Sequence, residues 1–144
     1  MSESIVCMIR GGASGRLVQE QGIHLAKERG ARLVFLHVVD VARLGLENPA
    51  LQEAARAEMT WLAWVTLSLA YRRARSSGVE VEQVVRYGKL FDSTLEYLKE
   101  HPAQHLLIGS PHLELPDYEE RLAKIKQFAR QIEDQTSVVV DIVR

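Results

Sequence analysis

The 144-residue chain is short of cysteine and has no excess of charge of either sign. Cys7 is the only cysteine, which excludes an internal disulfide and any metal site built from several cysteines. The five histidines are scattered without the spacing of metal ligands. A net charge of −1 provides no broad positive field to attract a nucleic-acid backbone. We therefore expect no metal and no nucleic-acid partner.

Long hydrophobic runs are also missing. The longest apolar tract, residues 59–71, is interrupted by polar residues and is shorter than the about 20 residues that a membrane span requires. Residues 1–4 carry an acid and no basic residue, which is unlike a secretory signal. These features predict a cytoplasmic protein without a membrane span. The length predicts a single domain over residues 1–144.

Five segments have the composition of β-strands. Residues 5–9 and 106–108 are continuous apolar runs, as in strands that are buried on both faces of a parallel sheet. Residues 32–39 are similar, and residues 137–143 carry one charge among five β-branched apolar residues. Residues 79–82 alternate valine with glutamate, which is typical of an edge strand.

Four helical segments alternate with these strands. Ser14 is the predicted N-cap of the first helix and Asp117 that of the last. Regular alternation predicts an α/β fold with a doubly wound, five-stranded parallel sheet in the order 3-2-1-4-5, Rossmann-like, with helices on both faces. Its ligand crevice would lie where the first and fourth strands end. The expected helices are residues 15–29, 49–77, 90–100 and 117–134.

The turn after the first strand is a candidate anion site. Arg10, Gly11 and Gly12 lie between a strand and a helix, a context in which backbone amides bind anions. The segment lacks both the P-loop and the dinucleotide-binding glycine patterns, so the motif is weak. A tight turn that simply requires glycine explains it equally well.

The order of several segments resembles the universal stress protein family. Residues 26–39, Gly88 ahead of a helix, and residues 106–110 carry the resemblance, which covers nearly the whole chain. The resemblance implies a small cytoplasmic homodimer that acts as a non-catalytic stress-response or signalling module. Some members of the family bind ATP and others do not.

The chain departs from the pattern of the ATP-binding members. They have an acidic residue after the first strand, where this chain has Arg10, and a glycine-rich stretch of the form G-x2-G-x9-G-[S/T] after the fourth. Here no glycine follows Gly109, and Pro111 and Pro116 remove two amide donors. Acidic residues at the start of the last helix would repel the phosphates of ATP. Alternatively, these acids only stabilise the helix through its dipole. We expect no tight ATP binding and no cofactor.

An alternative keeps the nucleotide, ATP or another adenine nucleotide such as AMP. The resemblance implies that the end of the second strand, at Val38, Val39 and Asp40, contacts adenine, although Asp40 could equally cap a loop. Arg10 with the Gly11-Gly12 turn would then neutralise phosphate. The other candidate ligand-binding residues, beyond the fourth strand, are Gly109, Ser110 and His112.

A second alternative is a hydrolase or nucleotidyl transferase on the same fold that uses Ser110 and His112. No serine, histidine and acid combination typical of a nucleophile is visible in the sequence, so we predict no catalytic residue. His37, in a buried strand, is interpreted as a core residue with a satisfied ring.

The last strand is a candidate dimer interface. An edge strand this apolar is normally covered, and an antiparallel pairing with a second copy would cover it. Coverage by the protein's own helices is the alternative. The residues assigned to this interface are Val138, Val139, Val140, Asp141, Ile142 and Val143.

The long helix is apolar almost all round near Trp61 and Trp64. A helix on one face of a sheet needs only one apolar stripe, so the surplus indicates a contact with a second subunit, a protein partner or an apolar ligand pocket. A helix that is shielded by the loop of residues 41–50 is the alternative.

Overall fold

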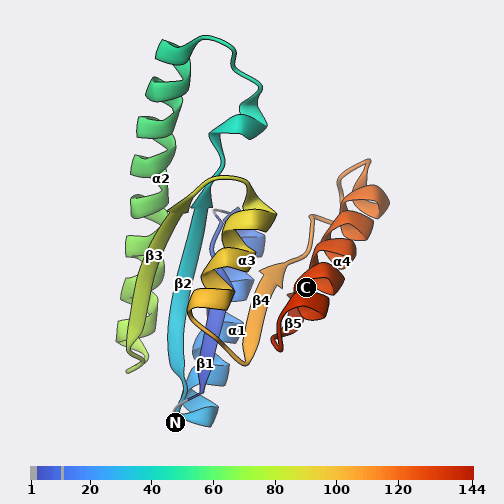
Figure 1. The fold of residues 1–144 in the computed structure, drawn as a ribbon. Coiled ribbons are helices and arrows are strands. Elements are labelled where there is room, and N and C mark those ends of the chain that lie inside the picture. Colours follow the sequence, from blue (N-terminus) through green and yellow to red (C-terminus); the bar gives the residue numbers. More distant parts are fainter. Residues whose placement is uncertain (1–2, 11) are drawn as a thin grey trace.

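The computed structural model describes residues 3–10 and 12–144 and arranges them as a sheet between two layers of helices (Figure 1). All strand pairs are parallel, and their order is β3-β2-β1-β4-β5. The predicted fold class is confirmed. The elements are β1 (Ser4–Met8), α1 (Gly12–Arg29), β2 (Arg32–Val39), the short 3-10 helix η1 (Val41–Leu44), α2 (Pro49–Ser76), β3 (Val81–Tyr87), α3 (Leu90–Glu100), β4 (His105–Gly109), α4 (Tyr118–Gln135) and β5 (Val139–Val143).

Each face of the sheet has its own hydrophobic core. Because side chains alternate along a strand, β1 sends Cys7 to one core and Val6 to the other. Residues of α1 and α2 complete the Cys7 core, and residues of α3 and α4 complete the Val6 core. This two-faced burial explains why the central strands are continuous apolar runs.

Two predicted boundaries are wrong. Helix α1 begins at Gly12, so Ser14 lies within the helix and is not its N-cap. Strand β3 begins at Val81 and continues to Tyr87, because it pairs with β2 along its whole length. Val79, predicted to start this strand, instead donates its N–H to the carbonyl of Ala74 and closes the end of α2.

Helix α2 is the longest element and extends beyond the ends of the strands (Figure 1). Asn48 caps it by accepting hydrogen bonds from the N–H groups of Ala50 and Leu51. Trp61 is 66% exposed and Trp64 is 43% exposed. The alternative in which the loop of residues 41–50 shields both tryptophans is therefore wrong.

Among the described residues, none of the helices has the length and apolar character to cross a membrane.

Candidate functional site

A cavity of about 510 Å³ opens where β1, β2 and β4 end. Its floor includes Ile9, Val38 and Gly109, which end or follow these three strands. The winding direction of the sheet reverses between β1 and β4, and ligands of doubly wound sheets bind at that point. The volume lies within the roughly 300–1,000 Å³ range of small-molecule sites.

Three cationic side chains from separate elements line this cavity. Arg10 follows β1, Arg43 lies in η1, and Lys124 lies on α4. The ion pairs found among the described residues involve none of the three. Three cations against one acid, Asp40, leave the lining with a net positive charge, which favours an anionic ligand.

His37 contributes a hydrogen-bond acceptor to the same cavity. Its Nδ1 lies 2.8 Å from the carbonyl oxygen of Ile9. A carbonyl only accepts, so Nδ1 carries the proton and Nε2 keeps its lone pair. Burial lowers the pKa of His37, the charge of Arg43 lowers it further, and the bond to Ile9 partly opposes both. The neutral ring can therefore accept a hydrogen bond from a ligand N–H or O–H group.

The lowered pKa of His37 predicts a loss of stability in acid. Its folded pKa lies below the ordinary value of 6.5, so between the two values the unfolded chain binds more protons. The contribution of His37 is complete above pH 6.5 and is lost as the pH falls through the folded pKa. We expect His37→Gln, which keeps a side-chain donor, to reduce the dependence of the unfolding free energy on pH in urea titrations below pH 6.5. Equal pH dependence in both proteins would contradict this assignment.

Asp40 also borders the cavity, but its carboxylate is engaged by the backbone. Its two oxygens accept hydrogen bonds from the N–H groups of Arg43 at 3.2 Å and Leu90 at 3.3 Å. The side chain thus caps η1 and fixes the start of α3. The structure supports the interpretation of Asp40 as a loop cap.

Apolar side chains form one wall of the cavity. They come from three helices: Met59 from α2, Leu90 from α3, and Ile125 and Phe128 from α4. Phe128 is fixed by an edge-to-face contact with Phe91, with ring centroids 5.7 Å apart. A wall of this composition suits a flat apolar group.

A sequence model described as "Universal stress protein family" matches residues 1–140. The chain belongs to this family. No curated protein sequence matches it. Solved structures share the fold of this universal stress protein. UspA from Lactobacillus plantarum has a TM-score of 0.81 at 16% identity, covering 99% of this chain and 97% of that one.

Two further relatives were solved with nucleotides. A universal stress protein in complex with cAMP has a TM-score of 0.69 at 18% identity, covering 99% of this chain and 97% of that one. One from Archaeoglobus fulgidus in complex with dAMP has a TM-score of 0.67 at 18% identity, covering 100% and 98%. At this identity the likeness shows the fold alone.

The structure brings some of the candidate ligand residues of this universal stress protein to the cavity. Arg10, Val38, Asp40 and Gly109 line it. Val39 does not, because its side chain is buried and its carbonyl accepts the N–H of Gly88 at 3.1 Å. Gly12 begins α1, and Gly11 lies outside the described residues.

Ser110 and His112 do not belong to this cavity. The N–H of Ser110 donates to the carbonyl of Val143, and His112 is exposed. No hydrogen bond between described residues joins their side chains. The described residues also contain no group of three histidine, cysteine or acidic side chains that could hold a metal ion.

The acids at the start of α4 lie outside the lining of the cavity. Asp117 makes no capping bond, contrary to the prediction, and accepts a hydrogen bond from Arg121 Nε at 2.8 Å. This bond lowers the pKa of Asp117. Glu119 and Glu120 are in the exposed first turn. The side of α4 that faces the crevice carries Lys124. A ligand in the crevice would therefore meet a positive charge there and not the repulsion expected from the acids.

Sequence reasoning missed several lining residues. Phe128 follows Ile125 by three residues and Lys124 by four, spacings that bring these side chains together on a helix, so this signal was present in the pattern of α4. Arg43 and Met59 had no such signal, because their approach to the cavity depends on the path of η1 and α2.

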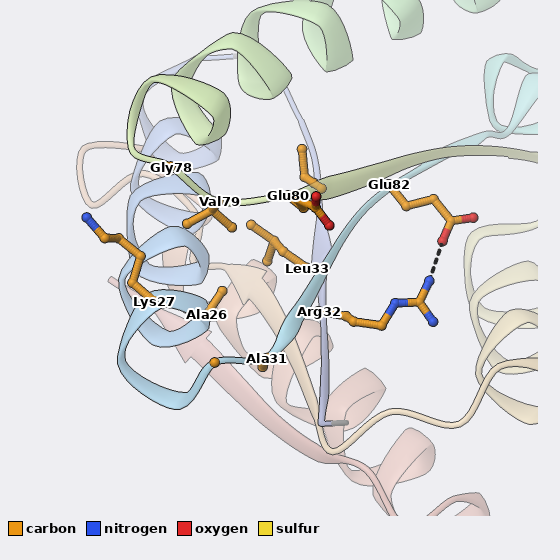
Figure 2. A pocket seen from close by; sticks show the side chains of 11 residues that line it. Ala26, Lys27, Ala31, Arg32, Leu33, Gly78, Val79, Glu80 and Glu82 are labelled. Atoms are coloured by element: carbon orange, nitrogen blue, oxygen red, sulfur yellow. Dashed lines mark hydrogen bonds and ion pairs between the residues drawn. The ribbon is translucent and has the colours of Figure 1, made fainter. Parts of the chain in front are cut away.

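A second hollow of about 750 Å³ lies at the opposite ends of β2 and β3 (Figure 2). Lys27, Glu80 and an Arg32–Glu82 ion pair at 3.3 Å surround it. Because its charges include both signs and one pair is already neutralised, it offers no concentrated field for an anion.

Proposed function

We propose that this universal stress protein is a non-catalytic regulatory module whose crevice binds an adenosine nucleotide with a single phosphate group. The observation that carries the proposal is that Arg10, Arg43 and Lys124, none of them in an ion pair with a described residue, line a cavity together with apolar side chains. In this role the phosphate lies among the cations, and the base lies against Met59 and Phe128.

The charge and the shape of the site both support a monophosphate. A phosphomonoester carries about −1.5 to −2 charges at pH 7, which three cations offset. His37 Nε2 can accept a hydrogen bond from the sugar or the exocyclic amine of the base. The relatives with cAMP and dAMP hold nucleotides of this class.

A triphosphate is disfavoured in this proposal. No glycine follows Gly109, so the segment between β4 and α4 lacks the convergent amides of a polyphosphate loop. Two prolines in that segment remove donors, and its Ser110 amide is bonded to Val143. Binding therefore depends on side-chain cations around one phosphate.

Calorimetry with AMP, ATP and adenosine tests the proposed ligand. We expect AMP to bind with a dissociation constant of about 1–100 μM, which corresponds to roughly 5–8 kcal/mol. Adenosine should bind at least about tenfold more weakly, since it lacks the charge that the cations recognise. ATP that binds more tightly than AMP, or no heat with any of the three, would refute the proposal.

We further propose that the chain acts as a single domain and forms a homodimer through β5, which is an edge of the sheet. The N–H of Val139 and the carbonyl of Val143 bond toward β4, so the alternating groups of Val140 and Ile142 point to the open edge. Val139 is 49% exposed there. A second β5 in antiparallel orientation would satisfy these groups.

One edge donor is already engaged within the chain. The carboxylate of Glu133 on α4 accepts a hydrogen bond from the N–H of Val140 at 2.9 Å. This contact competes with strand pairing, because one N–H cannot serve both partners well.

Glu133→Ala should therefore strengthen the β5 dimer. Each copy frees one edge donor worth about 1 kcal/mol, or about 2 kcal/mol per dimer, so we expect the dimer dissociation constant to fall about 30-fold in sedimentation velocity experiments. Asp134→Ala, an exposed neighbour with the same change in charge, is the matched control. Weaker association of the Glu133 variant would contradict pairing through this edge.

A further inference from the structure

The solvent side of α2 carries a continuous apolar stripe. Trp61 is 66% exposed, Leu62 is 52% exposed and Leu69 is 50% exposed, with Val65 between them at 39%. The side of the helix that packs on the sheet consists of buried Ala63, Leu67, Ala70 and Ala74. These two sets lie on opposite sides of the helix, so the fold of one chain leaves the exposed stripe without a partner. We call this stripe, with Glu58 and Arg72 at its two ends, the outer α2 face.

The spacing of the outer α2 face is that of a helix-pairing seam. Glu58, Leu62, Val65, Leu69 and Arg72 follow one another at intervals of four, three, four and three residues. Glu58 and Arg72 lie seven residues before and after Val65. The centre of the seam is apolar, and its two ends carry opposite charges.

We propose that the outer α2 face binds a second copy of this chain, with the two α2 helices antiparallel about a twofold axis at Val65. In this arrangement Glu58 of each copy lies opposite Arg72 of the other, so both charges are paired twice by symmetry. The dipoles of the two helices are also antiparallel, which is favourable.

The apolar residues match in the same register. Trp61 of one copy lies level with Leu69 of the other, and Val65 meets its own copy at the axis. Leu62 lies level with Ser68 of the second copy, whose small side chain leaves space for the leucine. Each large side chain therefore meets an apolar or a small one.

The charges of the outer α2 face decide between a second copy and a lipid surface. Among ion pairs of the described residues, neither Glu58 nor Arg72 takes part. Glu58 lies one turn from Trp61 and Leu62 on the same stripe, so inserting this face into a membrane would desolvate an unpaired carboxylate. A second antiparallel copy supplies an arginine at that position.

The expected contact is modest in size. From residue 58 to residue 72 the seam is about 21 Å long, at about 1.5 Å per residue. That length is less than a permanent interface requires, so the pairing is reversible and concentration-dependent. It uses neither the β5 edge nor the ligand cavity, and its failure would leave the proposed nucleotide function intact.

Charge reversal tests the proposal directly. Glu58→Arg places two arginines together at each end of the pair, and Arg72→Glu places two glutamates there. We expect each single variant to associate at least about tenfold more weakly than the original chain. An equimolar mixture of the two variants restores both opposite-charge contacts, so its affinity should return to within about threefold of the original value.

Tryptophan emission provides the readout, because both tryptophans of the chain lie on α2. Burial of Trp61 in the pair shifts the emission to shorter wavelength as the concentration rises, whether or not β5 also pairs. Single variants that shift like the original protein, or a mixture that fails to recover, would overturn the proposal. A shift that occurs only with phosphatidylserine vesicles would assign the face to lipid and also overturn it.

Cysteine cross-linking tests the antiparallel register. Val65→Cys places two thiols at the axis, and mild oxidation should give a disulfide-linked dimer. Ala54→Cys is the matched control, since it is exposed on the same side of α2 but its two copies would lie about 33 Å apart along the antiparallel pair. The native Cys7 is buried with a raised pKa and does not compete. Equal cross-linking of both variants would indicate a parallel pair and refute the register.

Discussion

Replacing Gly22 with valine should lower the free energy of unfolding by about 3 kcal/mol, the upper range for overpacking a core. Gly22 is buried on α1, and a Cβ at this position would overlap the sulfur of Cys7 and approach Leu33 to 3.3 Å. Cys7 pairs with Phe35 of β2 and with Leu107 of β4, so the backbone that carries the sulfur is held on both sides and cannot move away. The absence of a side chain at Gly22 therefore sets how closely α1 lies against the sheet.

Cys7→Ala separates this overlap from a general effect on the helix. Removal of the sulfur should cost about 1 kcal/mol by itself but should return about half of the loss caused by Gly22→Val, measured by urea denaturation. Gln21→Val, an exposed neighbour on α1, should change stability by less than about 0.5 kcal/mol. Strict additivity of the Cys7 and Gly22 variants would show that the two side chains do not conflict.

Removing Arg43 and Lys124 together should weaken AMP binding by about 100-fold. Each forms a charge-assisted contact with the phosphate in the proposed complex, and such contacts are worth about 1.5 kcal/mol or more. Because both side chains are exposed, we expect the free energy of each contact to lie at the lower end of that range. Titration calorimetry of the double alanine variant at low ionic strength measures the loss.

The control for this pair is Lys126→Ala with Arg130→Ala. Both control residues are exposed on α4 and outside the cavity lining, and the change in net charge is the same. AMP affinity should fall by less than about threefold in the control. Similar losses in the two double variants would show that binding responds to net charge and not to this crevice.

The elements that sequence patterns predicted best are those with strong boundary residues. Strand β2 and helix α3 have the predicted bounds. Gly30, at a φ of +61°, ends α1 just before β2, and Pro102 follows α3. The start of β3 was predicted two residues too early, because the valine–glutamate alternation is continuous across the point where pairing with β2 begins.

The position of the candidate site could be predicted from the sequence, but only some of its lining residues could. The strand order places the crevice at the ends of β1 and β4, which the sequence pattern is sufficient to infer. The side chains that fill it depend on the paths of loops and on which turn of each helix faces inward. Arg43 lies four residues after the end of β2, and Lys124 lies in the second turn of α4. The acids at Glu119 and Glu120 are close in sequence to the crevice but lie outside its lining.

The overhang of α2 beyond the strands places the two proposed recognition surfaces on a single helical turn. Met59 lines the cavity at the ends of the strands, and Glu58 lies on the outer α2 face. A nucleotide that tilts this turn alters the energy of helix pairing. Thermodynamic linkage then requires that pairing alter nucleotide affinity by the same factor. Through the turn at Met59, the fraction of paired chains would therefore depend on the concentration of the nucleotide.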